Sequence, residues 1–231
     1  MNPEKTCSIC QTAVAGNYCS HCGQKYSEKK THTLTLLVDL VTNFFSMERS
    51  GFATILKVLK NPKSIVNNYH NGFRKYHASP GQILVYGIAV VALHVAFVTD
   101  EILGIELKLD NLAVQYAFWI FLYPFFISIS YISFFRVEKS FSKHLVSLIY
   151  IATSLFIAIT VVNDIIISIW GDILGGYGFV LFVALIFFWN SRVFTTRKKP
   201  IFILLNALLQ IAIFAGIVAL IVNNIEYFST N

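Results

Sequence analysis

Four cysteines near the start of the chain are the residues best suited to chemistry. They form two Cys-x-x-Cys pairs, Cys7 with Cys10 and Cys19 with Cys22, and no other cysteine occurs in the 231 residues. Each pair can turn two thiolates toward one ion, and two pairs complete the tetrahedral sulfur site of a structural zinc ion. The spacing therefore predicts a zinc ribbon over residues 1–30, although iron would fit the same four sulfurs.

The expected zinc ion has a physical reason to be there. The first thirty residues are mostly polar, so metal binding would supply folding free energy that a small hydrophobic core cannot. Gly23 follows the last cysteine, where a residue that tolerates positive φ helps the turn close. Beyond this structural role, the module could be a docking surface for a cytoplasmic protein partner. Nucleic acid is not an expected partner, because the region lacks a dense basic and aromatic face.

The composition indicates that lipid is the main solvent of the rest of the chain. Hydrophobic residues make up 56% and charged residues only 13%, about half the charged fraction of a soluble domain. The first thirty residues contain no apolar run of signal-peptide type, which favours a reduced, cytoplasmic N-terminus. We therefore expect an integral membrane protein with a cytoplasmic N-terminus.

Five apolar segments have the length or flanks of membrane spans. We expect them at Gln82–Thr99, Ala113–Phe135, within His144–Trp170, at Tyr177–Asn190 and at Ile201–Val222. The first opens at Ser79-Pro80, a plausible helix cap followed by a first-turn proline. The expected fold class is thus an all-α membrane protein, with a five-helix transmembrane domain over residues 80–231.

The charges between these segments support five crossings. Ten basic residues precede Pro80, and the connections after the second and fourth spans are also basic. The connections after the first and third spans and the C-terminal tail are acidic or nearly uncharged. Basic and non-basic segments alternate at every crossing, as expected when the N-terminus is cytoplasmic and the C-terminus periplasmic. This alternation accounts for most of the net charge of +6.

Residues 31–79 are expected to form juxtamembrane amphipathic helices. The pattern predicts helices at Thr33–Met47 and Gly51–Lys60, the second capped by Ser50, and a third starting at Asn61-Pro62. Such helices pack under the bundle or lie on the membrane surface. Arg74 and Lys75, close to the first span, are a candidate contact for anionic lipid, and ordinary interfacial anchoring is the alternative.

Four polar residues are candidates for an intramembrane site: His94, Asp164, Asn206 and Gln210. Asn206 and Gln210 share one helix face, which is typical of hydrogen bonding between helices. Asp164 is the one acid that a span could embed. It either lies at the outer interface without a special role or pairs with His94 along a polar path.

Three stretches of the first 95 residues carry a resemblance. They are Tyr18-Cys19-Ser20-His21-Cys22-Gly23-Gln24-Lys25, Glu48–Thr54 with Leu59-Lys60-Asn61-Pro62, and Tyr69–Tyr76 with the following Pro80. Together they resemble a family of bacterial membrane proteins with an N-terminal zinc ribbon, mainly from Bacteroidota and classed as a domain of unknown function. The third stretch departs from the family's Gly-x-Arg-x-x-Tyr element by one residue. The resemblance implies a fold and a location in the bacterial inner (cytoplasmic) membrane. It does not indicate which activity the protein has.

Enzyme signatures are absent from the chain, which holds no Gly-x-Ser-x-Gly, no His-Glu-x-x-His and no phosphate-binding glycine loop. We therefore expect a non-enzymatic interaction or adaptor protein whose zinc ribbon engages a cytoplasmic partner. The alternative is a small channel or transporter, expected to be a homo-oligomer and gated or assembled by the zinc module. A membrane-disrupting effector is the third hypothesis.

Overall fold

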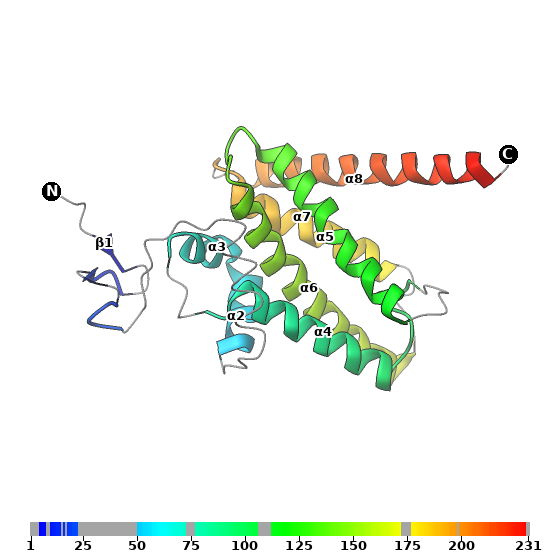
Figure 1. The fold of residues 1–231 in the computed structure, drawn as a ribbon, viewed down its shortest axis with the longest axis horizontal. Helices are drawn as coiled ribbons and strands as arrows, with labels where there is room; N and C mark the ends of the chain where they lie inside the picture. Colours follow the sequence, from blue (N-terminus) through cyan, green and yellow to red (C-terminus); the bar gives the residue numbers. More distant parts are fainter. Residues whose placement is uncertain are drawn as a thin grey trace.

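The computed structural model is an assembly of helices with a small N-terminal hairpin (Figure 1). It describes residues 5–7, 10–14, 16, 18–22, 50–72, 77–105, 112–171, 177–197 and 199–229. The side chains of residues 5, 50, 112–121 and 224–229 are outside this description, as are the expected helix at Thr33–Met47 and the candidate lipid contact of Arg74 and Lys75.

The hairpin pairs two short antiparallel strands, β1 (Lys5–Thr6) and β2 (Ala13–Val14), with Lys5 opposite Val14. The backbone N–H of Cys7 donates to the carbonyl of Thr12, which continues the pairing beyond β1. Among the described residues, the two strands contact each other and no helix. The hairpin and the cysteines around it are therefore a separate small unit.

Two short helices follow, α2 (Ser50–Lys60) and α3 (Pro62–His70). Asn61 caps α3, since its side chain accepts a hydrogen bond from the Ser64 N–H, and Pro62 occupies the first turn. Both helices pack against α6, α3 also against α7, and α2 also against α4. The juxtamembrane helices were expected either to pack under the bundle or to lie on the membrane surface, and these contacts agree with packing. The expected helix at 51–60 and the expected start at Asn61-Pro62 are both present.

The long helices are α4 (Pro80–Phe97), α5 (Leu112–Phe134), α6 (Phe141–Trp170), α7 (Tyr177–Phe194) and α8 (Pro200–Ser229). Each expected span falls on one of them. Four helices are long and apolar enough to cross a membrane: α4, α6, α7, and α8 as far as Asn223. The described side chains of α5 form a shorter apolar stretch, Leu122–Phe134, so the fifth crossing stays a prediction.

The start of α4 shows why the helix begins where it does. Ser79 Oγ accepts the Gln82 N–H at 3.2 Å, and Gln82 Oε1 accepts the Ser79 N–H at 2.7 Å. This reciprocal cap satisfies two amide donors at the helix end, and Pro80 needs no partner there. The Ala78 carbonyl accepts the hydroxyl of Tyr150 on α6, so the cap is also fixed to the bundle.

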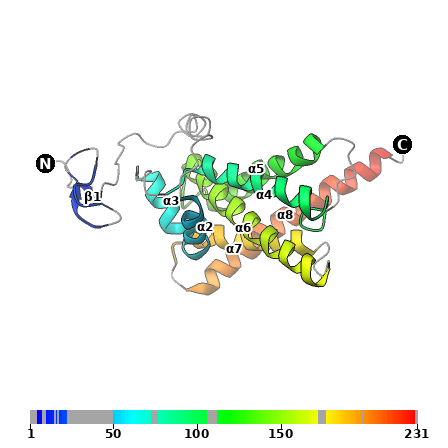
Figure 2. The same ribbon diagram turned by 90° about the horizontal axis from the view of Figure 1, so that it is seen from below.

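Helix α6 is the centre of the assembly. It contacts α2, α3, α4, α5 and α7, and it runs beside α4 for much of its length (Figures 1 and 2). Gly87 permits this approach, because a Cβ at this position would lie 2.7 Å from Cγ2 of Thr153. By contrast, α8 contacts α7 and α5 alone among the described elements, and most of its described side chains are exposed within the single chain.

Candidate metal and intramembrane polar sites

The four cysteine sulfurs gather in one place. All four Sγ atoms lie within 4.8 Å of one another, with Cys7 and Cys22 at 3.5 Å and Cys10 and Cys19 at 3.4 Å. These separations are too long for disulfides, whose sulfurs lie about 2.05 Å apart. They are close to the spacing of about 3.8 Å that a tetrahedral zinc ion with bonds of about 2.3 Å imposes. The residues therefore fit a metal ion.

The hairpin positions these sulfurs. Cys7 follows β1 directly, Cys10 lies in the turn, and the turn closes because Gln11 adopts φ 58° and donates its N–H to the Cys7 carbonyl. Cys7 and Cys19 are buried with Val14 in the only apolar cluster found among the described residues of this unit. The second turn places Cys19 and Cys22 opposite the first, so each short sulfur pair joins the two turns.

Thr12 prepares one of the ligands. Its hydroxyl lies 3.3 Å from Cys10 Sγ, and hydrogen bonds from the Thr12 side chain and backbone lower the pKa of Cys10 from 9.0 to about 5. The thiolate is the form that binds metal, so this geometry favours the ligating state at neutral pH. Thr12 and Gln11 were not among the residues predicted from the sequence. The residue expected to adopt positive φ and help the turn close was Gly23, which lies outside the described residues.

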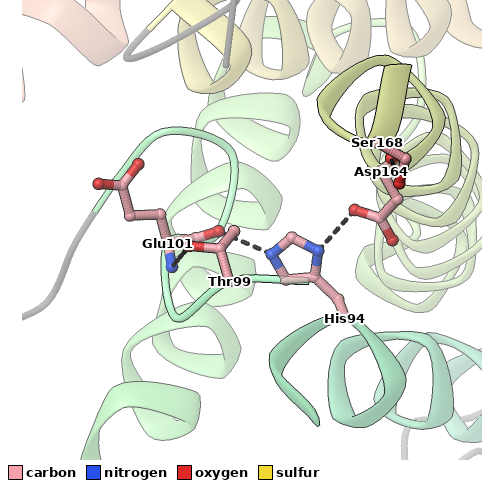
Figure 3. Close-up of polar contacts among 5 residues, drawn as sticks. All are labelled: His94, Thr99, Glu101, Asp164 and Ser168. Carbon is pink, nitrogen blue, oxygen red and sulfur yellow. Dashed lines mark hydrogen bonds and ion pairs between the residues drawn. The ribbon is translucent and has the colours of Figure 1, made fainter. Parts of the chain in front are cut away.

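A second site joins α4 to α6 (Figure 3). His94 Nδ1 lies 2.6 Å from Asp164 Oδ1, and His94 Nε2 lies 2.7 Å from the carbonyl oxygen of Glu101. His94 is 2% exposed, so both ring nitrogens are satisfied within the protein. Two candidates that are seventy residues apart in the sequence are thus direct partners.

The chemistry of these contacts fixes the number of protons. A backbone carbonyl only accepts, so His94 Nε2 carries a hydrogen and donates it to Glu101. The hydrogen bond to Asp164 holds a second proton, either on the imidazole or on the carboxyl group. In both forms the pair has zero net charge, which is the arrangement that a low-dielectric environment tolerates.

The same contacts anchor the segment after α4. Its residues Ile102 and Leu103 are buried in the main core, and Leu103 and Gly104 have positive φ values of 53° and 75°. Gly178 at the start of α7 permits the close approach, because a Cβ there would lie 3.0 Å from the Leu103 carbonyl oxygen. This segment folds back onto the bundle, and His94 is the side chain that ties it to α6.

A third polar group lies between α5, α6, α7 and α8. Asn190 Nδ2 donates to Ser130 Oγ at 2.9 Å and to Gln210 Oε1 at 2.8 Å. Ser130 Oγ lies 2.8 Å from His144 Nδ1, and His144 Nε2 donates to the Glu138 carbonyl at 3.1 Å. In the neutral imidazole Nδ1 is then the acceptor, so the bonds run in one direction from Asn190 through Ser130 to His144.

The remaining candidates complete this polar group. Gln210 Nε2 donates to Ser191 Oγ at 2.8 Å, and Asn206 Nδ2 donates to Thr195 Oγ1 at 2.9 Å. Both contacts join α8 to α7 or to the residue after it, so Asn206 and Gln210 act between helices. Sequence reasoning missed Ser130, His144 and Asn190. They lie near helix ends, where polar residues are common and carry no distinct signal.

No family model matches the chain, and no curated protein and no solved structure matches it. The assignment of these sites therefore depends on their geometry alone: a thiol cluster that fits a metal ion, and polar groups that pair with one another across helices.

Proposed function

We propose that this chain is a non-enzymatic adaptor of the bacterial inner membrane, whose N-terminal zinc ribbon binds a protein partner in the cytoplasm. The observation that carries the proposal is the separate cysteine unit, whose strands contact no described helix while its four thiols fit one metal ion. A unit built in this way is folded by its metal and free to present a surface of its own. The resemblance to the zinc-ribbon membrane family supports the zinc ribbon and the inner-membrane location, and not the adaptor activity.

The intramembrane polar groups support an adaptor rather than a pathway. His94 pairs with Asp164, Asn190 with Gln210, and Asn206 with Thr195. Polar side chains that satisfy one another between helices stabilise a bundle, and they need no permeating ion or solute to explain them. The alternation of basic and non-basic connections supports five crossings, with the N-terminus cytoplasmic and the C-terminus periplasmic.

The metal assignment is tested on the purified full-length protein by measuring bound zinc and iron. We expect about one zinc ion per chain, and we expect loss of that ion in the double variant Cys7→Ser, Cys10→Ser. Ser20→Ala is the matched control, because Ser20 lies between the ligands Cys19 and Cys22 and its side chain is exposed. Retention of the ion by the double variant would show that the site is assigned wrongly, and iron in place of zinc would correct the cofactor.

The adaptor role is tested by crosslinking in intact cells. The double cysteine variant should still insert in the membrane, because the helices pack without the hairpin, and it should lose crosslinks that the Ser20→Ala control keeps. An unchanged crosslinking pattern would remove the zinc unit as the partner surface.

A small oligomeric channel or transporter is the second candidate, and the observation that favours it is the partial exposure of Asp164, 23% for its side chain, beside the buried His94. Ion and solute flux into liposomes containing the zinc-loaded protein distinguishes the two functions. Flux that falls on Asp164→Asn or His94→Ala, and not on Glu101→Gln, would establish a pathway at this pair. A tight membrane under every gradient agrees with the adaptor.

A further inference from the structure

No other described residue covers one apolar face of helix α2. Phe52 is 73% exposed and Leu56 is 44% exposed, and their spacing of four residues places them on the same side of the helix. The opposite side is buried, with Ile55 and Val58 in the core formed with the long helices. The exposed pair is therefore an apolar surface on a helix that is already fixed in place.

The same surface becomes basic toward its end. Lys57 and Lys60 lie in the last turn of α2 and Lys63 in the first turn of α3, and all three side chains are exposed. No Asp or Glu occurs between Ser50 and Gly72. The surface is thus apolar at Phe52 and Leu56 and cationic from Lys57 onward, which is the pattern of a helix lying at an anionic membrane surface.

The contacts of α2 with the long helices fix its position in the bundle. Its first turn lies against α4 at Tyr86, since a Cβ on Gly51 would overlap the Tyr86 ring. Tyr86 is six residues past the start of α4, which is about 9 Å along the helix. The beginning of α2, and with it Phe52, therefore lies beside the body of a candidate span.

The other end of α2 lies near the end of α7. The indole N–H of Trp189 donates to the Leu59 carbonyl at 2.9 Å, and Arg192 Nη2 reaches the Lys60 carbonyl at 3.5 Å. Trp and Arg are residues typical of the membrane–water interface. Helix α2 is therefore held at its start by α4 and at its end by α7, and its last carbonyls lie beside side chains of interfacial type.

We propose that this face of α2 binds anionic phospholipid of the cytoplasmic leaflet, with Phe52 and Leu56 among the acyl chains and Lys60 and Lys63 on the phosphates. The charge of the surface is complementary to these lipids, and the contact of Gly51 with Tyr86 places Phe52 next to a candidate span, which favours lipid over a soluble protein. This site is distinct from Arg74 and Lys75, and it does not rest on the proposed adaptor function.

The lipid preference is tested by thermal unfolding of the full-length protein in nanodiscs of phosphatidylcholine with or without phosphatidylglycerol. We expect phosphatidylglycerol to raise the unfolding midpoint by roughly 2–4 °C, since a ligand that binds only the folded state stabilises it. The variant Lys60→Gln, Lys63→Gln should lose at least half of that increase. The matched control is Arg136→Gln, Lys139→Gln, which removes two exposed cations from the connection between α5 and α6.

The outcomes separate a local site from a general attraction. Loss of the increase only in the α2–α3 variant supports the proposal. Equal loss in both variants would mean that any cation on this side suffices, and no increase in the unmodified protein would also overturn the proposal.

A photoreactive benzoyl-phenylalanine in place of Phe52 tests the occupant directly in the same nanodiscs. We expect crosslinks whose added mass is that of a phospholipid. Crosslinks to a second copy of the chain, or none in lipid while the same side chain in place of Phe125 on α5 gives them, would contradict a lipid contact.

Discussion

Asp164 and His94 close a contact between α6 and α4 at 2.6 Å, and the second nitrogen of the same imidazole is held by the Glu101 carbonyl. One side chain thus joins two long helices and the segment that follows the first of them. Because His94 is buried and each of its ring nitrogens has one hydrogen-bond partner, any change that removes a partner leaves a polar ring nitrogen unpaired inside the protein.

Asp164→Ala should lower the free energy of unfolding by about 1–3 kcal/mol, because His94 Nδ1 loses its hydrogen-bond partner. Asp164→Asn should cost less, since an amide oxygen still accepts at this position. Unfolding in mixed micelles with increasing SDS measures both. Ser168→Ala, which removes an exposed hydroxyl that bonds only to the Asp164 carbonyl on its own helix, is the control. An equal effect of Asp164→Ala and Ser168→Ala would show that the pair contributes no stability.

Asn190 and Gln210 should be energetically coupled. A double-mutant cycle with Asn190→Leu and Gln210→Leu should give a coupling energy of about 0.6–1.7 kcal/mol, the range for hydrogen bonds between membrane helices. Asn190→Leu with Asn206→Leu is the control cycle, because Asn206 bonds to Thr195 and shares no side-chain bond with Asn190. That cycle should be additive, and a coupling of similar size in both cycles would refute a specific Asn190–Gln210 contact.

Gly87 should tolerate no side chain. Ala at this position would meet Cγ2 of Thr153, and Thr153 is held by a hydrogen bond of 2.7 Å to the Tyr123 hydroxyl. Gly87→Ala should therefore cost about 1–3 kcal/mol through strain between α4 and α6. Gly216→Ala on α8 should instead gain up to about 1 kcal/mol, because nothing lies within 4 Å of its Cβ position. Unfolding measurements in the same micelles compare the two, and equal effects would contradict the close packing.

His77 should make stability depend on pH. Burial, and then the nearby charge of Lys57, lower the pKa of His77 from 6.5 to about 4. Folding therefore disfavours the protonated form of His77. The free energy of unfolding is unaffected by this residue above pH 6.5, and it decreases as the pH falls from 6.5 toward 4. The loss amounts to at most about 3 kcal/mol.

The pH dependence is checked by unfolding His77→Gln at pH 7 and at pH 4.5, where the variant should show a smaller difference than the unmodified protein. Thr54→Val is the control, because it removes the hydrogen bond to the Ala78 N–H and no titrating group. It should lower stability by the same amount at both pH values. A full pH effect in His77→Gln would assign the titration to another residue.

Gln11→Gly should strengthen the metal unit. Gln11 has φ 58°, a conformation that costs a residue with a Cβ about 1 kcal/mol relative to glycine. Zinc retention against a chelator should improve about fivefold. Gly16→Ala, where nothing lies within 4 Å of the Cβ position, should leave retention unchanged. Weaker retention by Gln11→Gly would mean that the Gln11 side chain has a role of its own.

The sequence could predict features that depend on local spacing. Two Cys-x-x-Cys pairs bring four sulfurs together through their own turns, and Ser79 with Pro80 marks a helix start through contacts three residues away. The predicted apolar segments likewise lie on helices, because the length and composition of a segment determine whether it forms a long apolar helix. The pairing of His94 with Asp164 remained one of two alternatives, since it depends on the register of a thirty-residue helix.

Contacts that depend on helix rotation could not be predicted. Asn206 and Gln210 share a face in any helix, but their partners Thr195 and Asn190 follow from how α7 and α8 are turned toward each other. Gln11 gave no signal either, because glutamine is not a residue that favours positive φ, and only the closed turn around the cysteines imposes it.

Among the described elements, helix α8 contacts α5 and α7, and this arrangement has a consequence for synthesis. Helix α8 follows the other long helices in the sequence, so α4 to α7 can gather around α6 while α8 is still absent. During that interval the Asn190 amide lacks the Gln210 oxygen that accepts one of its hydrogens in the finished protein. Arrival of α8 supplies this acceptor, so the packing of α8 is the step that satisfies the Asn190 amide.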